Sequence, residues 1–311
     1  MAATVADLLR AAAERLGAAG VENPRREAAW LLAGALGVSV SDLRLHPERA
    51  VPPAAAATFA RWVERRAARE PLQYILGTQE FLGLTFRVTP AVLIPRPETE
   101  VLVLRFAEAL RDAFPGPGPL RVADIGTGSG CIAVALCRLL PAVEVWAVDL
   151  SPEALAVAGE NARQHGVADR IHLLAGDLYG PLAGMRLHGI VSNPPYIPAA
   201  ELPELQPEVR DYEPRLALTP GEDGLGVIRQ LIAGAPAHLL PGGVLALEVG
   251  AGQGEAVLAM MGGAGFDARG YRDDLGHLRA VVGIWPRAGD DRPGAERSRE
   301  WVLRPGDSRR R

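Results

Sequence analysis

Over residues 4–70, apolar positions recur with the spacing of amphipathic helices. The pattern predicts helices over residues 7–16, 24–36, 41–45 and 58–69. Asn23 followed by Pro24 is typical of a helix start, because asparagine caps the first turn and proline suits its first position. We therefore expect a small all-α domain over residues 1–75.

The pattern changes to strand-like alternation in the next segment. Residues 80–88 predict a β-hairpin with its turn near Gly83. Pro95 and Pro97 stiffen the chain that follows, because proline fixes φ. We interpret residues 76–97 as a β-hairpin linker between two domains.

From residue 98 to residue 286, short apolar strands alternate with helical segments. Strands are expected over residues 121–124, 143–148, 171–175, 188–192, 244–249 and 279–284. Helices are expected over residues 131–140, 152–165, 226–238 and 256–261. This alternation predicts an α/β domain whose sheet is mostly parallel and covered on both faces. Beyond it the apolar pattern fades, so residues 287–311 are expected to form a disordered tail.

The composition suits a protein with a packed core, since 48% of its residues are hydrophobic and its formal net charge is −4. The mild acidity disfavours a general nucleic-acid binder, although a local basic patch stays open. No apolar run approaches the length of a membrane span and no secretory signal is evident, so we expect a cytoplasmic protein. Cys131 and Cys137 lack metal-ligand spacing, so buried thiols and no metal site are expected.

Four arginines follow the polar side of the last predicted helix of the first domain, namely Arg61, Arg65, Arg66 and Arg69. The simpler interpretation is a solvated helix face. The alternative is a docking surface for an acidic partner or for RNA.

The stretch Asn193-Pro194-Pro195-Tyr196 ends the strand expected over residues 188–192. The prolines fix φ and donate no hydrogen bond, so Asn193 lies on a stiff, extended backbone. The Asn193 side-chain oxygen and the Pro194 carbonyl can together accept hydrogen bonds from both protons of an NH2 group. Tyr196 offers a flat face on which a planar group can stack. A Pro-Pro turn that only closes a strand is the alternative for this stretch taken alone.

A glycine-rich turn follows the strand over residues 121–124 and consists of Gly126, Thr127, Gly128, Ser129 and Gly130. Glycines at the carboxyl end of a parallel strand let the backbone approach a ligand closely. The spacing is G-x-G-x-G, whereas nicotinamide dinucleotide folds use G-x-G-x-x-G, and the chain has no lysine for a P-loop. Phosphate is therefore not the expected ligand.

Two further acids end the next two strands. Asp149 ends the second strand, where a carboxylate can accept hydrogen bonds from both hydroxyls of a ribose. Asp177 follows the third strand, where it can receive an adenine amino group while Leu178 lies on the ring. Each acid alone could be a helix cap, but four strand ends in order form a specific constellation.

Six stretches carry a resemblance to a known family. They are Glu80-Phe81-Leu82-Gly83, Ile94-Pro95-Arg96-Pro97-Glu98-Thr99-Glu100, Asp124-Ile125-Gly126-Thr127-Gly128-Ser129-Gly130, Ser192-Asn193-Pro194-Pro195-Tyr196-Ile197, Tyr212-Glu213-Pro214 and Gly221-Glu222-Asp223-Gly224. The chain resembles the adenosylmethionine-dependent methyltransferases of the Rossmann-like fold and, among them, the PrmC/HemK family of peptide chain release factor N5-glutamine methyltransferases. The resemblance covers roughly residues 5–285 and departs at Gly276-His277-Leu278-Arg279 and at Leu178.

The resemblance implies a mostly parallel Rossmann-like sheet with an antiparallel last strand, in a catalytic domain over residues 98–286. It implies S-adenosyl-L-methionine as cofactor and methyl transfer to the glutamine amide nitrogen of the Gly-Gly-Gln motif in peptide chain release factors. The implied partner is the release factor, held by the helical domain over residues 1–75. We expect no membrane association, no stable nucleic-acid partner and a monomer.

The implied roles fall on the motifs described above. Asn193 and Pro194 are the expected catalytic residues. Cofactor binding is expected from Gly126, Thr127, Gly128, Ser129, Gly130, Asp149, Asp177, Leu178 and Asn193. Substrate binding is expected from Asn193, Pro194, Pro195 and Tyr196.

Three alternatives stay open. A nucleic-acid adenine N6-methyltransferase could use the same two acceptors, but it predicts a large basic groove or a target-recognition domain. A nicotinamide-dependent oxidoreductase is disfavoured by the glycine spacing. A binding module without catalysis would have no use for an intact Asn-Pro-Pro-Tyr.

Overall fold

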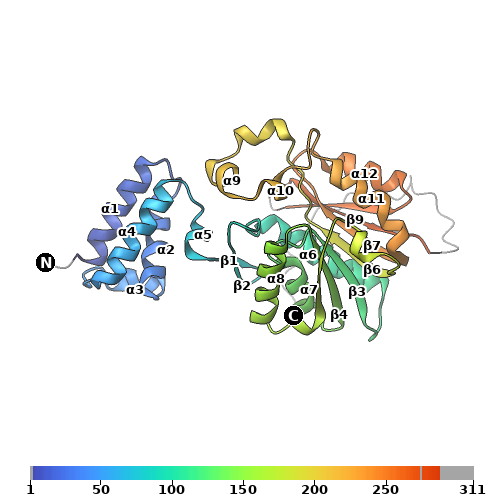
Figure 1. The fold of residues 1–311 in the computed structure, drawn as a ribbon, viewed down its shortest axis with the longest axis horizontal. Coiled ribbons are helices and arrows are strands. Elements are labelled where there is room, and N and C mark those ends of the chain that lie inside the picture. The colour runs from blue at the N-terminus through green and yellow to red at the C-terminus, as the bar shows by residue number, and fades with distance from the viewer. Residues whose placement is uncertain (1–2, 274, 288–311) are drawn as a thin grey trace. The chain divides into compact units, whose positions relative to one another are not determined.

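A computed structural model describes residues 3–273 and 275–287. The chain divides into two compact units, and Figure 1 labels their helices and strands. The first unit comprises Met1–Thr78 and Leu205–Tyr212, and the second comprises Gln79–Glu204 and Glu213–Arg311. The tail expected over residues 287–311 lies outside the described residues, apart from Arg287.

The first unit is built from helices, as predicted. They are α1 (Val5–Ala18), α2 (Pro24–Leu36), α3 (Val40–Leu45), α4 (Pro53–Ala67) and α5 (Leu72–Leu76). Thr4 and Asp7 form a reciprocal capping box at the start of α1, and Pro24 occupies the first turn of α2. The apolar faces meet in one core cluster that includes Leu16, Leu31 and Phe59.

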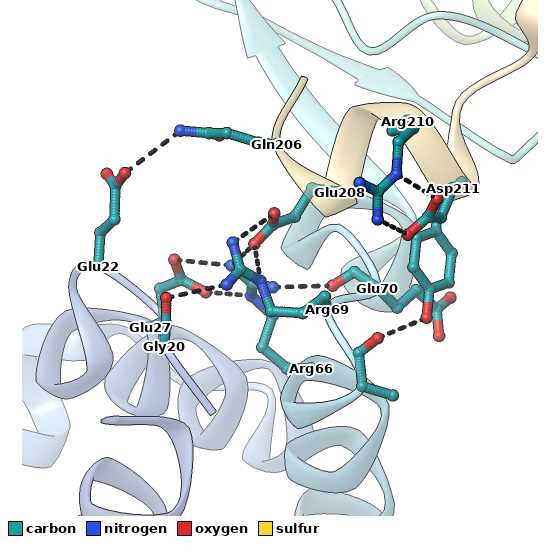
Figure 2. Close-up of polar contacts among 12 residues, drawn as sticks. Gly20, Glu22, Glu27, Arg66, Arg69, Glu70, Gln206, Glu208, Arg210 and Asp211 are labelled. Carbon is teal, nitrogen blue, oxygen red and sulfur yellow. Dashed lines mark hydrogen bonds and ion pairs between the residues drawn. The ribbon is translucent and has the colours of Figure 1, made fainter. Parts of the chain in front are cut away.

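An insertion from far along the chain completes this unit, which the sequence did not predict. The segment Leu205–Tyr212 contains α9 (Pro207–Tyr212) and carries Glu208. Glu208 accepts charged hydrogen bonds from Arg66 Nη2 at 2.8 Å and from Arg69 Nη2 at 2.7 Å. Arg66 Nε also lies 2.5 Å from Glu27 Oε2, so one buried guanidinium joins two carboxylates (Figure 2).

The solvated face that the sequence favoured holds for Arg61 and Arg65, which are exposed, but not for Arg66, which is buried, and only in part for Arg69, which lies beyond the end of α4. Arg66 is only 5% exposed. Arg65 pairs with Glu70 at 2.5 Å, and Arg61 donates to Thr58 at 3.2 Å. The acidic partners of the buried Arg66 are Glu27 and Glu208 of the same chain, so Arg66 is not available to an external acidic partner.

The second unit is a seven-stranded sheet in the order β5-β4-β3-β6-β7-β9-β8. The strands are β3 (Leu120–Ile125), β4 (Val143–Asp149), β5 (Ile171–Ala175), β6 (Leu187–Ser192), β7 (Leu239–Glu248), β8 (Asp267–Arg272) and β9 (Leu278–Ile284). β3 to β7 pair in parallel, and β9 pairs antiparallel with both of its neighbours. The mostly parallel sheet with an antiparallel last strand is thus confirmed. β8 was not predicted.

Helices cover both faces of this sheet, as Figure 1 shows. One core cluster joins it to α6 (Pro97–Ala113), α7 (Cys131–Leu139) and α8 (Pro152–Gln164). The other cluster joins it to α11 (Gly226–His238) and α12 (Gly254–Gly263). Shorter helices are η1 (Ala168–Arg170), η2 (Gly180–Leu182), η3 (Ala199–Glu204) and α10 (Arg215–Leu218).

The predicted hairpin is present as β1 (Thr78–Phe81) and β2 (Leu84–Arg87), with its turn at Leu82 and Gly83. It does not stand apart as a linker, because Phe81 and Phe86 are fully enclosed in the core of the second unit.

Within the described residues, no helix combines the length and the apolar character that crossing a bilayer requires. Cys131 and Cys137 are free and buried, and burial raises the pKa of their thiols to about 12 and about 11.

Candidate active site

A cavity of about 540 Å³ opens at the carboxyl ends of the parallel strands of the second unit. This volume is in the usual range for small-molecule sites, roughly 300–1,000 Å³. Its walls include Gly126, Thr127, Gly128 and Ser129, together with Asp149, Asp177, Leu178, Asn193, Pro194 and Pro195. The structure thus brings together most of the site residues that the sequence predicted, but not Gly130 or Tyr196.

The glycine turn has the conformation its composition allows. Gly126, Gly128 and Gly130 have φ of 74°, 53° and 77°, a region that residues with a Cβ rarely adopt. Gly130 caps α7, and a Cβ there would meet Ala158 at 3.0 Å. Gly130 thus packs the turn closely on α8 and does not line the cavity, and its role in cofactor binding stays a prediction.

A buried carboxylate lies at the end of β3, where the sequence assigned no role. Asp124 is fully buried, and this burial raises its pKa to about 7. Its Oδ2 accepts a hydrogen bond from Thr127 Oγ1 at 2.6 Å, which ties the turn to the strand.

Both carboxylate oxygens of Asp149 accept hydrogen bonds from backbone N–H groups. Oδ2 accepts from the Gly128 N–H at 2.8 Å and Oδ1 from the Ser151 N–H at 3.0 Å. Each oxygen keeps a lone pair for a ligand hydroxyl. Asp177 is exposed on the cavity wall, and Leu178 follows it with φ of 46°, which is unusual for a leucine.

Asn193 and Pro194 lie on the same cavity, directly after β6. Ser192 Oγ donates to the Ile125 carbonyl at 2.6 Å and so ties the end of β6 to β3. The Asn193 amide is held by one donor bond, from Nδ2 to Thr99 Oγ1 at 3.2 Å. In the described part of the chain, no donor pairs with Asn193 Oδ1 or with the Pro194 carbonyl.

Tyr196 does not line the cavity, in contrast to our expectation of a stacking face. Its hydroxyl donates to Glu248 Oε1 at 3.2 Å, and its carbonyl accepts from Gln253 Nε2 at 2.9 Å. Burial raises the pKa of its hydroxyl, so the phenol stays protonated. Tyr196 therefore anchors the Asn-Pro-Pro-Tyr stretch from behind.

Glu248 is a polar group of the site that the sequence reasoning missed. It ends β7, is 1% exposed and accepts from Thr99 Oγ1 at 2.6 Å. Burial raises its pKa to about 7, although the hydrogen bonds from Thr99 and Tyr196 oppose the rise. The sequence feature that could have predicted Glu248 is an acidic residue at the end of an apolar strand, which is the feature that identified Asp149.

Two stretches that carried the family resemblance contact one another. Arg96, a cavity residue, donates from Nη2 to both carboxylate oxygens of Glu213. The stretch that departs from the family, Gly276 to Arg279, lies at the β8–β9 turn, where Arg279 Nε donates to Asp273 Oδ2 at 3.0 Å. Its arginine thus holds a turn.

The fold and the motifs define the class of protein. Residues 104–203 match the family model "Methyltransferase small domain", and residues 7–77 match "PrmC N-terminal domain". A solved structure of the hMettl16 catalytic domain in complex with MAT2A 3'UTR hairpin 6 shares the fold, with a TM-score of 0.52 at 16% identity over 76% of this chain and 82% of that one. The chain is a methyltransferase with a Rossmann-like sheet.

Curated relatives identify the family. A release factor glutamine methyltransferase of Geobacter sulfurreducens is 52% identical over 85% of this chain and 90% of its own length. Those of Moorella thermoacetica and Cereibacter sphaeroides are 50% and 48% identical over 82% and 91% of this chain and 88% and 99% of their own lengths. The chain belongs to the release factor glutamine methyltransferase family.

Proposed function

We propose that this enzyme transfers a methyl group from S-adenosyl-L-methionine to the side-chain amide nitrogen of the glutamine in the Gly-Gly-Gln motif of peptide chain release factors. Because that substrate belongs to translation, the proposed location is the cytoplasm. The observation that carries the proposal is the pair Asn193 and Pro194, two acceptors side by side on one cavity wall. The names of the relatives give the substrate class.

The cavity suits adenosylmethionine in shape and chemistry. Gly126 and Gly128, both at positive φ on the cavity wall, put no side chain into the cavity, and Asp149 offers oxygens that can accept from ribose hydroxyls. Asp177 is available to an adenine amino group, with the apolar Leu178 beside it. When bound, adenosylmethionine supplies a methyl group on a sulfonium, and the carbon–sulfur bond breaks as the carbon–nitrogen bond forms, leaving a neutral thioether.

The residues of this chain contribute orientation and charge. An amide nitrogen is a weak nucleophile because its lone pair is delocalised. Asn193 Oδ1 and the Pro194 carbonyl would accept its two N–H groups and so hold the nitrogen toward the methyl carbon. Both oxygens also stabilise the positive charge that grows on the nitrogen, which then loses one proton to water.

The helical unit is proposed to contact the release factor outside the Gly-Gly-Gln loop. Its buried arginine is not the docking group, because Arg66 pairs with Glu27 and Glu208. We expect the enzyme to act as a monomer and to need no stable nucleic-acid partner.

The decisive experiment incubates the full chain with methyl-labelled adenosylmethionine and, separately, release factor, ribosomes, tRNA or DNA. We expect label on the release factor only, and none when the glutamine of its Gly-Gly-Gln motif is replaced by alanine. Label on adenine of DNA or RNA would instead identify an adenine N6-methyltransferase, because the amino group of adenine fits the same two acceptors.

A further inference from the structure

Three polar side chains form a continuous hydrogen-bonded network that runs from the cavity wall of the second unit to the buried Glu248. Asn193 Nδ2 donates to Thr99 Oγ1 at 3.2 Å, and Thr99 Oγ1 donates to Glu248 Oε2 at 2.6 Å. Thr99 and Glu248 are 2% and 1% exposed, so bulk water does not compete for either group. The three residues come from the loop after β6, the first turn of α6 and the end of β7.

The donor and acceptor of each hydrogen bond in this network are fixed, because a threonine hydroxyl has a single proton. An ionised Glu248 can only accept, so the Thr99 proton points toward it. The lone pairs of Thr99 Oγ1 then face Asn193, which must offer a donor, its NH2 group. Turning the Asn193 amide over would set its oxygen against those lone pairs and leave two buried acceptors face to face.

We infer that Thr99 and Glu248 are positioning residues for methyl transfer, which fix the Asn193 amide with Nδ2 inward and Oδ1 toward the cavity. This inference rests on the proposed function, since the orientation matters when Oδ1 must accept from a substrate N–H. With the amide turned over, its NH2 group would oppose the substrate NH2 group, donor against donor.

Protonation of Glu248 would reverse the donor and acceptor roles in these hydrogen bonds. A neutral carboxyl can donate to Thr99 Oγ1, which frees the Thr99 proton to donate to Asn193 Oδ1 and so stabilises the inverted amide. Because burial raises the pKa of Glu248 to about 7, the inversion falls in the neutral range. The competent form is the ionised one, and its fraction falls as pH drops below about 7.

The other groups that face Glu248 do not prevent it from changing its charge near pH 7. Glu98 on α6 raises its pKa further, and Arg279 on β9 lowers it. Tyr196 and Cys131 also face it, but burial raises the pKa of both, so neither changes charge near pH 7. Glu248 is therefore the group expected to titrate within this cluster.

The orientation can be measured without any turnover, because the chain has three asparagines, Asn23, Asn161 and Asn193. Labelling the full chain with 15N-asparagine gives side-chain NH2 signals that are assigned by comparison with Asn193→Ala. We expect one Asn193 proton to be hydrogen-bonded and slow to exchange, and to be lost in Thr99→Val but kept in Thr99→Ser. Asn161, which donates to the Arg87 and Ser129 carbonyls, is the internal control.

Turnover then tests the consequence. Thr99→Val should lower kcat by about 10- to 100-fold with KM for the release factor nearly unchanged, and Thr99→Ser should restore it. The wild-type kcat should fall below pH 7 with an acid limb that Glu248→Gln removes, because a glutamine side chain does not titrate in this pH range. The pKa of Asp124 is also raised to about 7, so Asp124 is the other group that could cause an acid limb. If Asp124 caused it, the acid limb would remain in Glu248→Gln.

The outcomes separate the two hypotheses. Unchanged Asn193 signals in Thr99→Val, or an acid limb that persists in Glu248→Gln, would overturn the positioning role. If the wild-type enzyme labels no release factor, the proposed function fails, and the amide spectra still decide whether Thr99 fixes the orientation of Asn193.

Discussion

Arg96 and Glu213, which are 117 residues apart in the sequence, form a forked contact in which Arg96 Nη2 lies 2.7 and 2.8 Å from the two carboxylate oxygens. The Glu213 side chain is 1% exposed and that of Arg96 is 31% exposed. Burial raises the pKa of Glu213, and the charge of Arg96 opposes the rise. The pair ties the start of α6 to the segment that supplies Pro214 and Leu216 to the cavity wall.

Removing the cation from this pair should loosen that wall. We predict that Arg96→Leu lowers the free energy of unfolding by about 2 kcal/mol, below the usual cost of breaking a buried pair because Arg96 is partly exposed. Adenosylmethionine affinity should also fall. Urea unfolding and calorimetry measure the two effects, and the double variant Arg96→Leu/Glu213→Leu should recover part of the stability. Equal stability of Arg96→Leu and wild type would show that the contact contributes nothing.

Two glycines of the same turn should respond differently to alanine. At Gly130, a Cβ would meet Ala158 at 3.0 Å, so Gly130→Ala should cost roughly 1–3 kcal/mol of unfolding free energy. At Gly128, a Cβ meets no atom within 4 Å, so Gly128→Ala should cost about 1 kcal/mol and chiefly weaken adenosylmethionine binding. Thermal unfolding with and without the ligand tests the contrast. The reverse order of the two effects would contradict the division between packing and binding.

The buried Arg66 of the helical unit should contribute to holding its inserted segment, together with Arg69. Arg66→Met leaves Glu27 without this cation and Glu208 with Arg69 alone, and should cost about 3 kcal/mol. Hydrogen exchange of residues 205–212 should rise at the same time. Arg61→Met is the matched control on the same helix and should change stability by less than about 0.5 kcal/mol. Equal hydrogen exchange of residues 205–212 in both variants would argue against a stabilising role of the Arg66–Glu208 contact drawn in Figure 2.

Glu248 should make stability fall as pH rises. Its folded pKa of about 7 lies above the ordinary 4.5, so between these values the folded state keeps a proton that the unfolded state has lost. Relative to Glu248→Gln, the free energy of unfolding of the wild type should therefore fall by up to about 3 kcal/mol as the pH rises from 4.5 to 7. Asp124 is present in both proteins, so its contribution to the pH dependence cancels in the difference between them. Denaturant unfolding at several pH values tests this, and parallel stability curves would be inconsistent with a raised pKa at Glu248.

Local signals predicted most of the fold and the front of the site. The strand over residues 171–175 and the helix over residues 226–238 were predicted with their observed bounds, because turn residues flank each apolar run. β8 was missed because Asp267, Arg269 and Arg272 hide its apolar alternation at the edge of the sheet.

The back of the site could not be found in the same way. Thr99 is 94 residues from Asn193 and 149 residues from Glu248, and in the sequence it is one polar residue in the first turn of a helix. The role of the arginines was likewise decided by Glu208, 142 residues from Arg66. Contacts over such separations depend on tertiary packing, which residue patterns along the chain do not record.

The most direct test of the two-acceptor hypothesis is the single-turnover rate of methyl transfer to purified release factor by Asn193→Ala, with adenosylmethionine affinity measured in parallel. We predict that the rate falls by about 10²–10³-fold, because one of the two acceptors for the amide N–H groups is gone. Adenosylmethionine should bind with an affinity within a few-fold of wild type. A variant that methylates the release factor at the wild-type rate would contradict the account.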